Sequence, residues 1–260
     1  DQVSSRGLGD VYKRQEQDSD TKKTRIVFTQ GGKGGVGKTD LCLSLVSWYR
    51  RIEIEPILFD YDVENTTKSS LQNFCPEARK HDVHLEGSLD ELFEVCDQDE
   101  VEIVLADLGS GAGQAAYRWF DTAYEDAKAL DIRFTAIGVT TNEVGSVQSI
   151  LKWANHLQDR VDYLVVLNEM REYASDFDYW HSEPTVESFV STCKPAVMRM
   201  DARIPEFQSE LRNQVCTVQD VIDGKVKSPF LRQMKNRMRA QRYQRVLFEG
   251  FDTASDILLP

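Results

Sequence analysis

The sequence has few cysteines, no long apolar run and no internal repeat, and each absence narrows the class of protein. Its five cysteines are widely spaced and form neither a CxxC pair nor a Cys/His cluster, which argues against a zinc or iron–sulfur site. No apolar run approaches the ~20 residues that span a bilayer, and the N-terminus lacks the charged-then-apolar order of a signal peptide. We therefore expect a soluble, cytoplasmic protein with reduced thiols.

Basic residues are fewer than acidic ones, 31 against 43, which gives a formal net charge of −12. Such a chain needs a local basic patch to meet nucleic acid or an anionic membrane. One patch lies between Lys225 and Leu247, where eight Lys/Arg and no acid occur, and it predicts a basic C-terminal helix over residues 227–247. The segment from Lys225 to Arg245 fits DNA phosphates or an acidic protein partner, and it also fits a helix that packs on the domain with a solvated basic face. A membrane partner is disfavoured, since acidic residues follow the segment.

The order of apolar segments predicts the fold. Residues 1–24 read as a disordered tail, of which 1–15 resemble a translated sequencing adapter, and residues 25–260 read as a single domain. Strands are predicted at 25–30, 57–60, 102–107, 132–140, 163–167 and 195–200, with helices at 89–95 and 144–157. This alternation indicates an α/β fold: a three-layer, doubly wound, mainly parallel sheet with helices on both faces and ligands at the carboxyl ends of its strands.

A glycine-rich loop follows the first predicted strand and precedes an amphipathic helix. It matches the P-loop template, in which glycines let successive backbone N–H groups converge on phosphate oxygens. An ordinary glycine-rich turn is the alternative, but the flanking strand and helix favour a P-loop NTPase. Lys38 would then reach the β- and γ-phosphates, and the Thr39 hydroxyl would ligate Mg²⁺. The predicted nucleotide-binding residues of the loop are Gly32, Gly34, Gly35, Val36, Gly37, Lys38 and Thr39.

A second lysine in this loop narrows the class further. The stretch from Lys33 to Thr39, Lys-Gly-Gly-Val-Gly-Lys-Thr, resembles the deviant Walker A box of ParA/MinD/ArsA-type ATPases. That resemblance implies ATP as ligand, a homodimer that forms on ATP binding, and Lys33 as a residue that contacts the partner subunit's phosphates while Lys38 acts in cis. The alternative is that Lys33 is only a solvated loop charge.

Two aspartates end the second predicted strand. Asp60 and Asp62 are two residues apart, so their side chains point to the same face. The arrangement resembles the family's switch I motif, Asp-x-Asp-Pro-x-x-Asn, which implies that Asp62 orients or deprotonates the attacking water and that Asp60 supports Mg²⁺ through its waters. Val63 replaces the proline of that motif. The alternative is that both acids merely end a strand and enter a polar loop.

Asp107 follows the third predicted strand as a Walker B aspartate does, and Asp107 to Gly111 resembles the family's Asp-x-x-x-Gly. The resemblance implies a role for Asp107 at Mg²⁺ and for the backbone N–H of Gly109 or Gly111 at the γ-phosphate.

Three weaker signals complete the predicted site. Asn168 matches the family's adenine-contacting asparagine, and Pro205 lies in a loop that resembles the one on the other side of the base. Asp40 stands where the family has a small hydroxyl residue. We expect Asp40 to point away from the site and to weaken nucleotide binding modestly.

The sequence therefore predicts a Mg-dependent ATPase, slow and stimulated by a partner, that acts as a dimerising switch. The segment from Phe59 to Thr67 resembles relatives in plasmid partition, mobilisation and conjugative transfer. A small-molecule phosphoryl-transfer enzyme or ligase, similar to dethiobiotin synthetase, is the alternative. An electron carrier similar to nitrogenase iron protein is disfavoured, because Cys96 precedes the Walker B strand.

Overall fold

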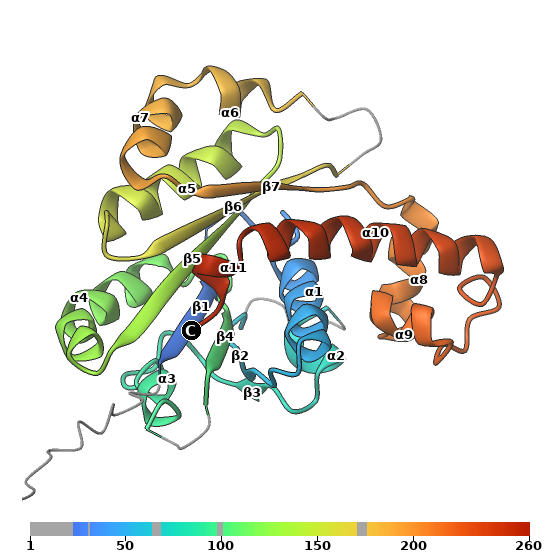
Figure 1. Cartoon of the computed structure of the whole chain (residues 1–260), viewed down its shortest axis with the longest axis horizontal. Helices are drawn as coiled ribbons and strands as arrows, with labels where there is room; N and C mark the ends of the chain where they lie inside the picture. The colour runs from blue at the N-terminus through green and yellow to red at the C-terminus, as the bar shows by residue number, and fades with distance from the viewer. Residues whose placement is uncertain (1–22, 31, 64–68, 98–100, 171–175) are drawn as a thin grey trace, which may run out of the picture.

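The structure, a computed structural model, describes residues 23–30, 32–63, 69–97, 101–170 and 176–260 (Figure 1). The tail predicted over residues 1–24 lies outside the described residues except for its last two, and Thr24 already belongs to the first strand. Gly31 of the glycine-rich loop and residues 64–66 of the switch I motif also lie outside them.

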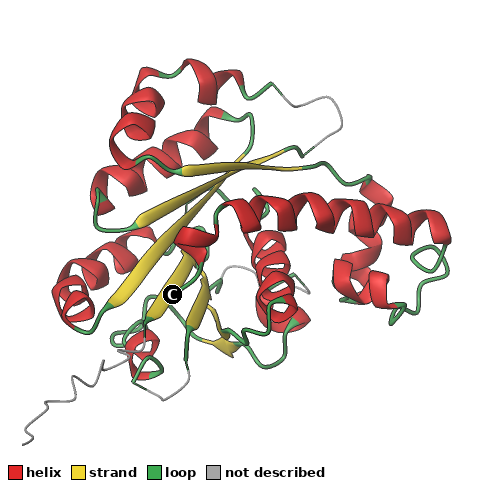
Figure 2. Ribbon diagram, in the orientation of Figure 1, coloured by secondary structure: helices red, strands yellow, loops and turns green. Residues whose placement is uncertain are grey.

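A parallel sheet of seven strands forms the centre of the described chain, in the order β3-β2-β4-β1-β5-β6-β7. The predicted α/β fold with a parallel sheet is thereby confirmed. Figure 2 shows the sheet between its helices. The strands are β1 (Thr24–Thr29), β2 (Ile57–Asp60), β3 (Arg79–Lys80), β4 (Ile103–Asp107), β5 (Ile132–Thr140), β6 (Asp162–Asn168) and β7 (Ala196–Met200).

Helices cover both faces of the sheet because the strands are apolar on both sides. Within β1, Ile26 and Phe28 pack into one core cluster and Val27 into the other, as the alternation of side chains along a strand requires. The first cluster lies under α3 (Glu91–Glu94), α4 (Gly113–Ala129), α5 (Val144–Leu157), α6 (Asp178–Ser182) and α7 (Pro184–Cys193). The second lies under α1 (Lys38–Arg51), α2 (Leu71–Phe74), α10 (Met234–Thr253) and α11 (Ser255–Leu258).

The connections define where a ligand site is expected. The helix after β1 covers one face and the helix after β4 covers the other, although β1 and β4 are neighbours in the sheet. Such a reversal opens a crevice beyond the carboxyl ends of the two strands. The glycine-rich loop and Asp107 both lie at this point.

A third, smaller core cluster holds together what we term the C-terminal lobe: α8 (Pro205–Gln214), α9 (Val218–Asp223) and the first half of α10. Figure 1 shows the lobe at one end of the long helix α10, which continues back across α1. The basic helix predicted over 227–247 begins only at Met234 and continues to Thr253. Pro229 disfavours helical geometry at Ser228, and residues 229–232 form a turn before the helix begins.

The start of the sheet is tied to the last helix by a buried arginine. Arg25 in β1 is almost fully buried, and its guanidinium donates to Asp162 Oδ2 at 2.6 Å, to Thr135 Oγ1 at 2.8 Å and to the Leu259 carbonyl at 2.6 Å. This charge is therefore paired and hydrogen-bonded, as a buried charge must be. None of the described helices combines the length and apolar character needed to cross a membrane.

Candidate functional site

The loop between β1 and α1 is built from residues that tolerate left-handed backbone. Gly32, Gly35 and Gly37 have φ of 138°, 75° and 102°, values that favour glycine. Gly37 is also the N-cap of α1, so no side chain occupies the amino end of that helix. Unsatisfied backbone N–H groups and the positive end of the helix dipole face outward there, which is the arrangement that binds a phosphate group.

The two lysines of the loop lie in different places. Lys38 is buried and lines the cavity at the loop, where its ammonium donates to the backbone carbonyl of Lys33 at 3.1 Å. The Lys33 side chain is exposed and pairs instead with Glu143, the N-cap of α5, at 3.2 Å. Lys33 is not part of the cavity wall within this one subunit. Sequence reasoning missed Glu143, whose only signal is its position just after β5.

Asp107 at the end of β4 is held by two threonine hydroxyls. Thr39 donates to one carboxylate oxygen at 2.6 Å and Thr29 to the other at 3.0 Å. Burial raises the pKa of Asp107 to about 6, and the negative charge of Asp60 adds to this, whereas the hydrogen bonds from the threonines and the charge of Lys38 oppose it. Thr39 and Asp107, predicted as a metal-binding pair, are therefore in direct contact.

Asp60, at the end of β2, is held by hydrogen bonds within the protein and does not face the cavity as Asp62 does. Asp60 is fully buried, and it accepts hydrogen bonds from Lys80 Nζ at 2.9 Å and from the backbone N–H groups of Asp62 and Gln72 at 3.1 and 2.9 Å. Lys80 also donates to the backbone carbonyl of Asp62 at 2.7 Å. Asp60 and Lys80 thus fix the backbone on both sides of the switch I segment. The predicted role of Asp60 near magnesium stays a prediction.

Asp62 reaches the cavity and lies against the turn after β4. A Cβ atom placed on Gly109 would be 2.9 Å from Asp62 Oδ1 and 3.0 Å from its Cα. Only glycine allows this approach without a shift. The predicted switch I segment and the turn from Asp107 to Gly111, which we term switch II, are therefore in contact beside the loop.

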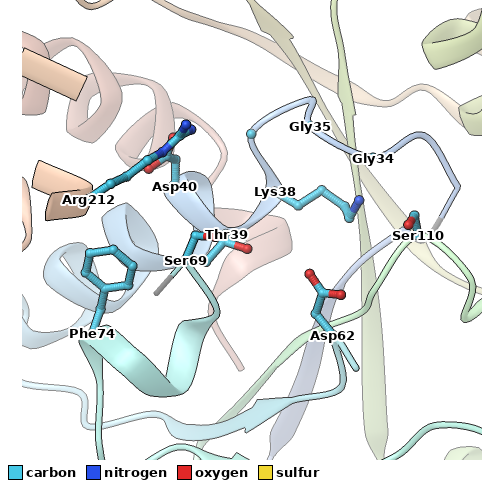
Figure 3. A pocket seen from close by; sticks show the side chains of 11 residues that line it. Gly34, Gly35, Lys38, Thr39, Asp40, Asp62, Ser69, Phe74, Ser110 and Arg212 are labelled. Carbon is cyan, nitrogen blue, oxygen red and sulfur yellow. The ribbon is translucent and has the colours of Figure 1, made fainter. Parts of the chain in front are cut away.

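A cavity of about 360 Å³ joins these features, and Figure 3 shows the side chains that line it. Lys38, Asp62 and Ser110 lie on one side of it in this view, and Phe74 and Arg212 lie on the other. Of the predicted site residues, Gly34, Gly35, Gly37, Lys38, Thr39 and Asp62 line the cavity.

The predicted base-contacting residues lie at the edge of the loop. Asn168 at the end of β6 is buried, and its Nδ2 donates to the Val36 carbonyl at 2.7 Å. Its amide thereby packs on Gly37, where an added Cβ would come within 2.5 Å of Nδ2. Pro205 is the first residue of α8. A contact of either residue with a base stays a prediction.

Asp40, expected to point away from the site, lines the cavity at the end opposite Lys38 (Figure 3). Its carboxylate pairs with Arg203 at 2.6 Å and accepts from Gln208 at 2.7 Å. Charge compensation holds the carboxylate there, because Arg203, in the loop before α8, supplies a cation that the expectation did not include. Sequence reasoning missed this contact, since Gln208 is 168 residues from Asp40. The effect of Asp40 on nucleotide binding stays a prediction.

The fold and the position of the loop define a P-loop NTPase fold. Among solved structures, the chain is similar to the MinD cell division protein of Aquifex aeolicus, with 16% identity, a TM-score of 0.51, and coverage of 91% of this chain and 99% of that one. It also matches the signal recognition particle 54 kDa protein of Aeropyrum pernix K1 in complex with GDP, with 15% identity, a TM-score of 0.43, and coverage of 86% and 58%. No protein-family model and no curated protein matches the chain. At these identities, the first likeness shows the fold alone.

Proposed function

We propose that this protein is a cytoplasmic, Mg-dependent ATPase that dimerises on binding ATP and hydrolyses it slowly to ADP and phosphate. The observation that carries the proposal is the cavity at the P-loop, where Lys38 and Thr39 at the start of α1 meet Asp62 from just after the end of β2. The contact between Asp62 and Gly109 adds a link between the two segments that would sense the γ-phosphate.

Each residue has a chemical role in this proposal. The backbone N–H groups of the loop and the Lys38 ammonium bind the phosphate oxygens and stabilise the charge that develops during hydrolysis. Asp62 orients the attacking water or takes its proton. Movement of the Gly109 backbone toward the γ-phosphate would displace Asp62, so the two switches would respond together.

The residues present fit a magnesium ion. Thr39 and Asp107 offer hydroxyl and carboxylate oxygens, the hard ligands that Mg²⁺ prefers, and these oxygens are 2.6 Å apart. Bound magnesium would neutralise phosphate charge, with Asp60 supporting its water shell. The described residues contain no cluster of three or more His, Cys, Asp or Glu for a metal, which suits an ion held largely by phosphate and water.

Dimerisation is proposed from the position of Lys33. Its side chain is exposed, and among the described residues its ammonium pairs only with the exposed carboxylate of Glu143. An exposed pair of this kind contributes little stability, about 0–1 kcal/mol. Lys33 can therefore exchange Glu143 for the phosphates of a second subunit at small cost.

The proposed partner of the dimer is DNA, in plasmid partition, mobilisation or conjugative transfer. Five basic residues of α10 are exposed: Lys235, Arg237, Arg239, Arg242 and Arg245. The buried residues Asn236, Ala240 and Tyr243 attach the same helix to the rest of the protein. A fixed helix with an exposed basic face fits a DNA backbone, with binding that weakens as salt is added. An acidic protein partner is the other outcome of the test below.

The ATPase switch is tested by size-exclusion chromatography with and without ATP and Mg²⁺, together with phosphate release. We expect the wild type to dimerise and hydrolyse ATP, Asp62→Ala to dimerise without hydrolysis, and Lys38→Ala to do neither. Asp126→Ala, which removes an exposed acid on α4, is the control. A protein that stays monomeric and turns over only after a small acceptor is added would instead be a group-transfer enzyme.

The DNA partner is tested by measuring DNA affinity at several salt concentrations. Arg237→Glu combined with Arg242→Glu should weaken binding and lower the slope of its salt dependence by about 2, since each lost phosphate contact reduces the slope by about 1. The matched control reverses the exposed Lys128 and Lys152, which lie on α4 and α5. An equal loss of DNA affinity in both double variants would mean that only the net charge of the protein matters. No loss of affinity in either variant would exclude α10 as the DNA-binding surface.

A further inference from the structure

The C-terminal lobe places a second cation at the P-loop cavity. Arg212, in the last turn of α8, lines the same cavity as Lys38 and Thr39. Its side chain is exposed, and it forms no ion pair with an acid of the described residues. Figure 3 shows its guanidinium extended toward the amino end of α1, beside Asp40.

The acid nearest to this guanidinium is already neutralised by another arginine. Asp40 pairs with Arg203 at 2.6 Å and accepts from Gln208 at 2.7 Å. Arg203 is itself fixed, because its side chain is only 11% exposed and its guanidinium lies 4.7 Å from the centre of the Tyr243 ring. The charges of Asp40 and Arg203 cancel, so Arg212 gives this end of the cavity a positive potential.

The position of Arg212 indicates which part of a nucleotide it meets. In a P-loop site, the lysine reaches the β- and γ-phosphates, and the switch segments meet the γ-phosphate. Lys38 and Asp62 therefore mark the γ-phosphate end, and Arg212 lies across the cavity with Phe74. That opposite end would hold the α-phosphate and the nucleoside.

We propose that Arg212 binds the α-phosphate of the nucleotide, so that the C-terminal lobe forms one wall of the nucleotide site. This inference rests on the proposed function. Guanidinium groups form bidentate, charge-assisted hydrogen bonds with phosphate, which an exposed arginine at a cavity mouth can make by rotating its side chain.

The proposal is tested by isothermal titration calorimetry, in which each protein is titrated in the presence of Mg²⁺ with one of three ligands. The ligands are ADP, a non-hydrolysable ATP analogue and inorganic triphosphate. The proteins are the wild type, Arg212→Ala, Arg212→Lys and the control Asn213→Ala, a neighbouring exposed residue on α8. Arg212→Ala should raise the Kd for ADP and for the ATP analogue by the same factor, roughly tenfold. It should also weaken the binding of inorganic triphosphate. Arg212→Lys should recover part of the loss, and Asn213→Ala should bind like the wild type.

Three results would overturn the proposal, and a fourth would refute the proposed function. Unchanged Kd values for Arg212→Ala would show that Arg212 is not a ligand. A loss confined to the ATP analogue would move the contact to the γ-phosphate, and a loss confined to the two nucleotides would move it to the nucleoside. Failure of the wild type to bind any of the three ligands would instead refute the proposed function, on which this inference depends. Thermal unfolding of each variant separates these results from a loss of fold.

Discussion

The buried carboxyl of Asp107 makes a quantitative prediction about stability and pH. Its pKa is raised from 3.8 to about 6 in the folded protein, chiefly by burial. The folded state therefore holds the proton more tightly than the unfolded state, and this group adds stability as the pH falls through 6. Between about pH 7.5 and pH 5, the linkage amounts to about 1.4 kcal/mol. Asp107→Asn removes the titrating group. On going from about pH 7.5 to pH 5, the free energy of unfolding of the wild type should therefore rise by about this amount relative to that of the variant.

The assay is urea unfolding of both proteins at about pH 7.5, 6 and 5, in EDTA and without nucleotide. Comparing the two proteins cancels the pH dependence of all other groups. Asn at position 107 changes the hydrogen bonds with Thr29 and Thr39. The stability difference that this change causes does not depend on pH. Asp126→Asn, on an exposed part of α4, is the control for losing one negative charge. A wild-type-minus-variant difference that stays constant from pH 7.5 to 5 would refute the argument.

Three further substitutions test the contacts around the site and the core. Gly109→Ala should slow phosphate release by at least roughly tenfold, measured in single-turnover experiments, because its Cβ would displace Asp62. Lys80→Met should lower kcat by roughly tenfold with little change in the Kd for ADP, and Lys80→Arg should restore part of the lost kcat. An equal effect of Arg79→Met, on the same strand, would contradict a specific role for Lys80. Arg25→Met should destabilise the protein by about 2–3 kcal/mol in urea unfolding, since it breaks a partly buried ion pair and removes the donor to the Leu259 carbonyl. A loss near zero would show that these contacts are dispensable.

Sequence patterns predicted the elements whose apolar residues repeat over a full strand or helix. The strand over 132–140 and the helix over 144–157 occur with the predicted bounds, and the other predicted strands differ by at most one residue at each end. The parallel sheet and the contact between Thr39 and Asp107 followed from the same patterns, because loops after parallel strands meet at one edge.

Contacts across long sequence distances were not predictable in this way. Strand β3 has only two residues, both exposed, so no hydrophobic pattern marks it, and the role of Lys80 was missed with it. The ion pair between Asp40 and Arg203 joins α1 to the loop between β7 and α8, and no local pattern specifies such a pairing. The start of α10 was misplaced because basic composition continues through the turn at Pro229.

The buried guanidinium of Arg25 has a consequence for how the chain is made. Arg25 lies in the first strand, yet one of its hydrogen-bond acceptors is the carbonyl of Leu259, 234 residues later. The ribosome adds Leu259 long after Arg25, so the central strand stays incompletely satisfied until the chain through α11 has emerged. A nascent chain arrested before α11 should therefore remain sensitive to protease at its core.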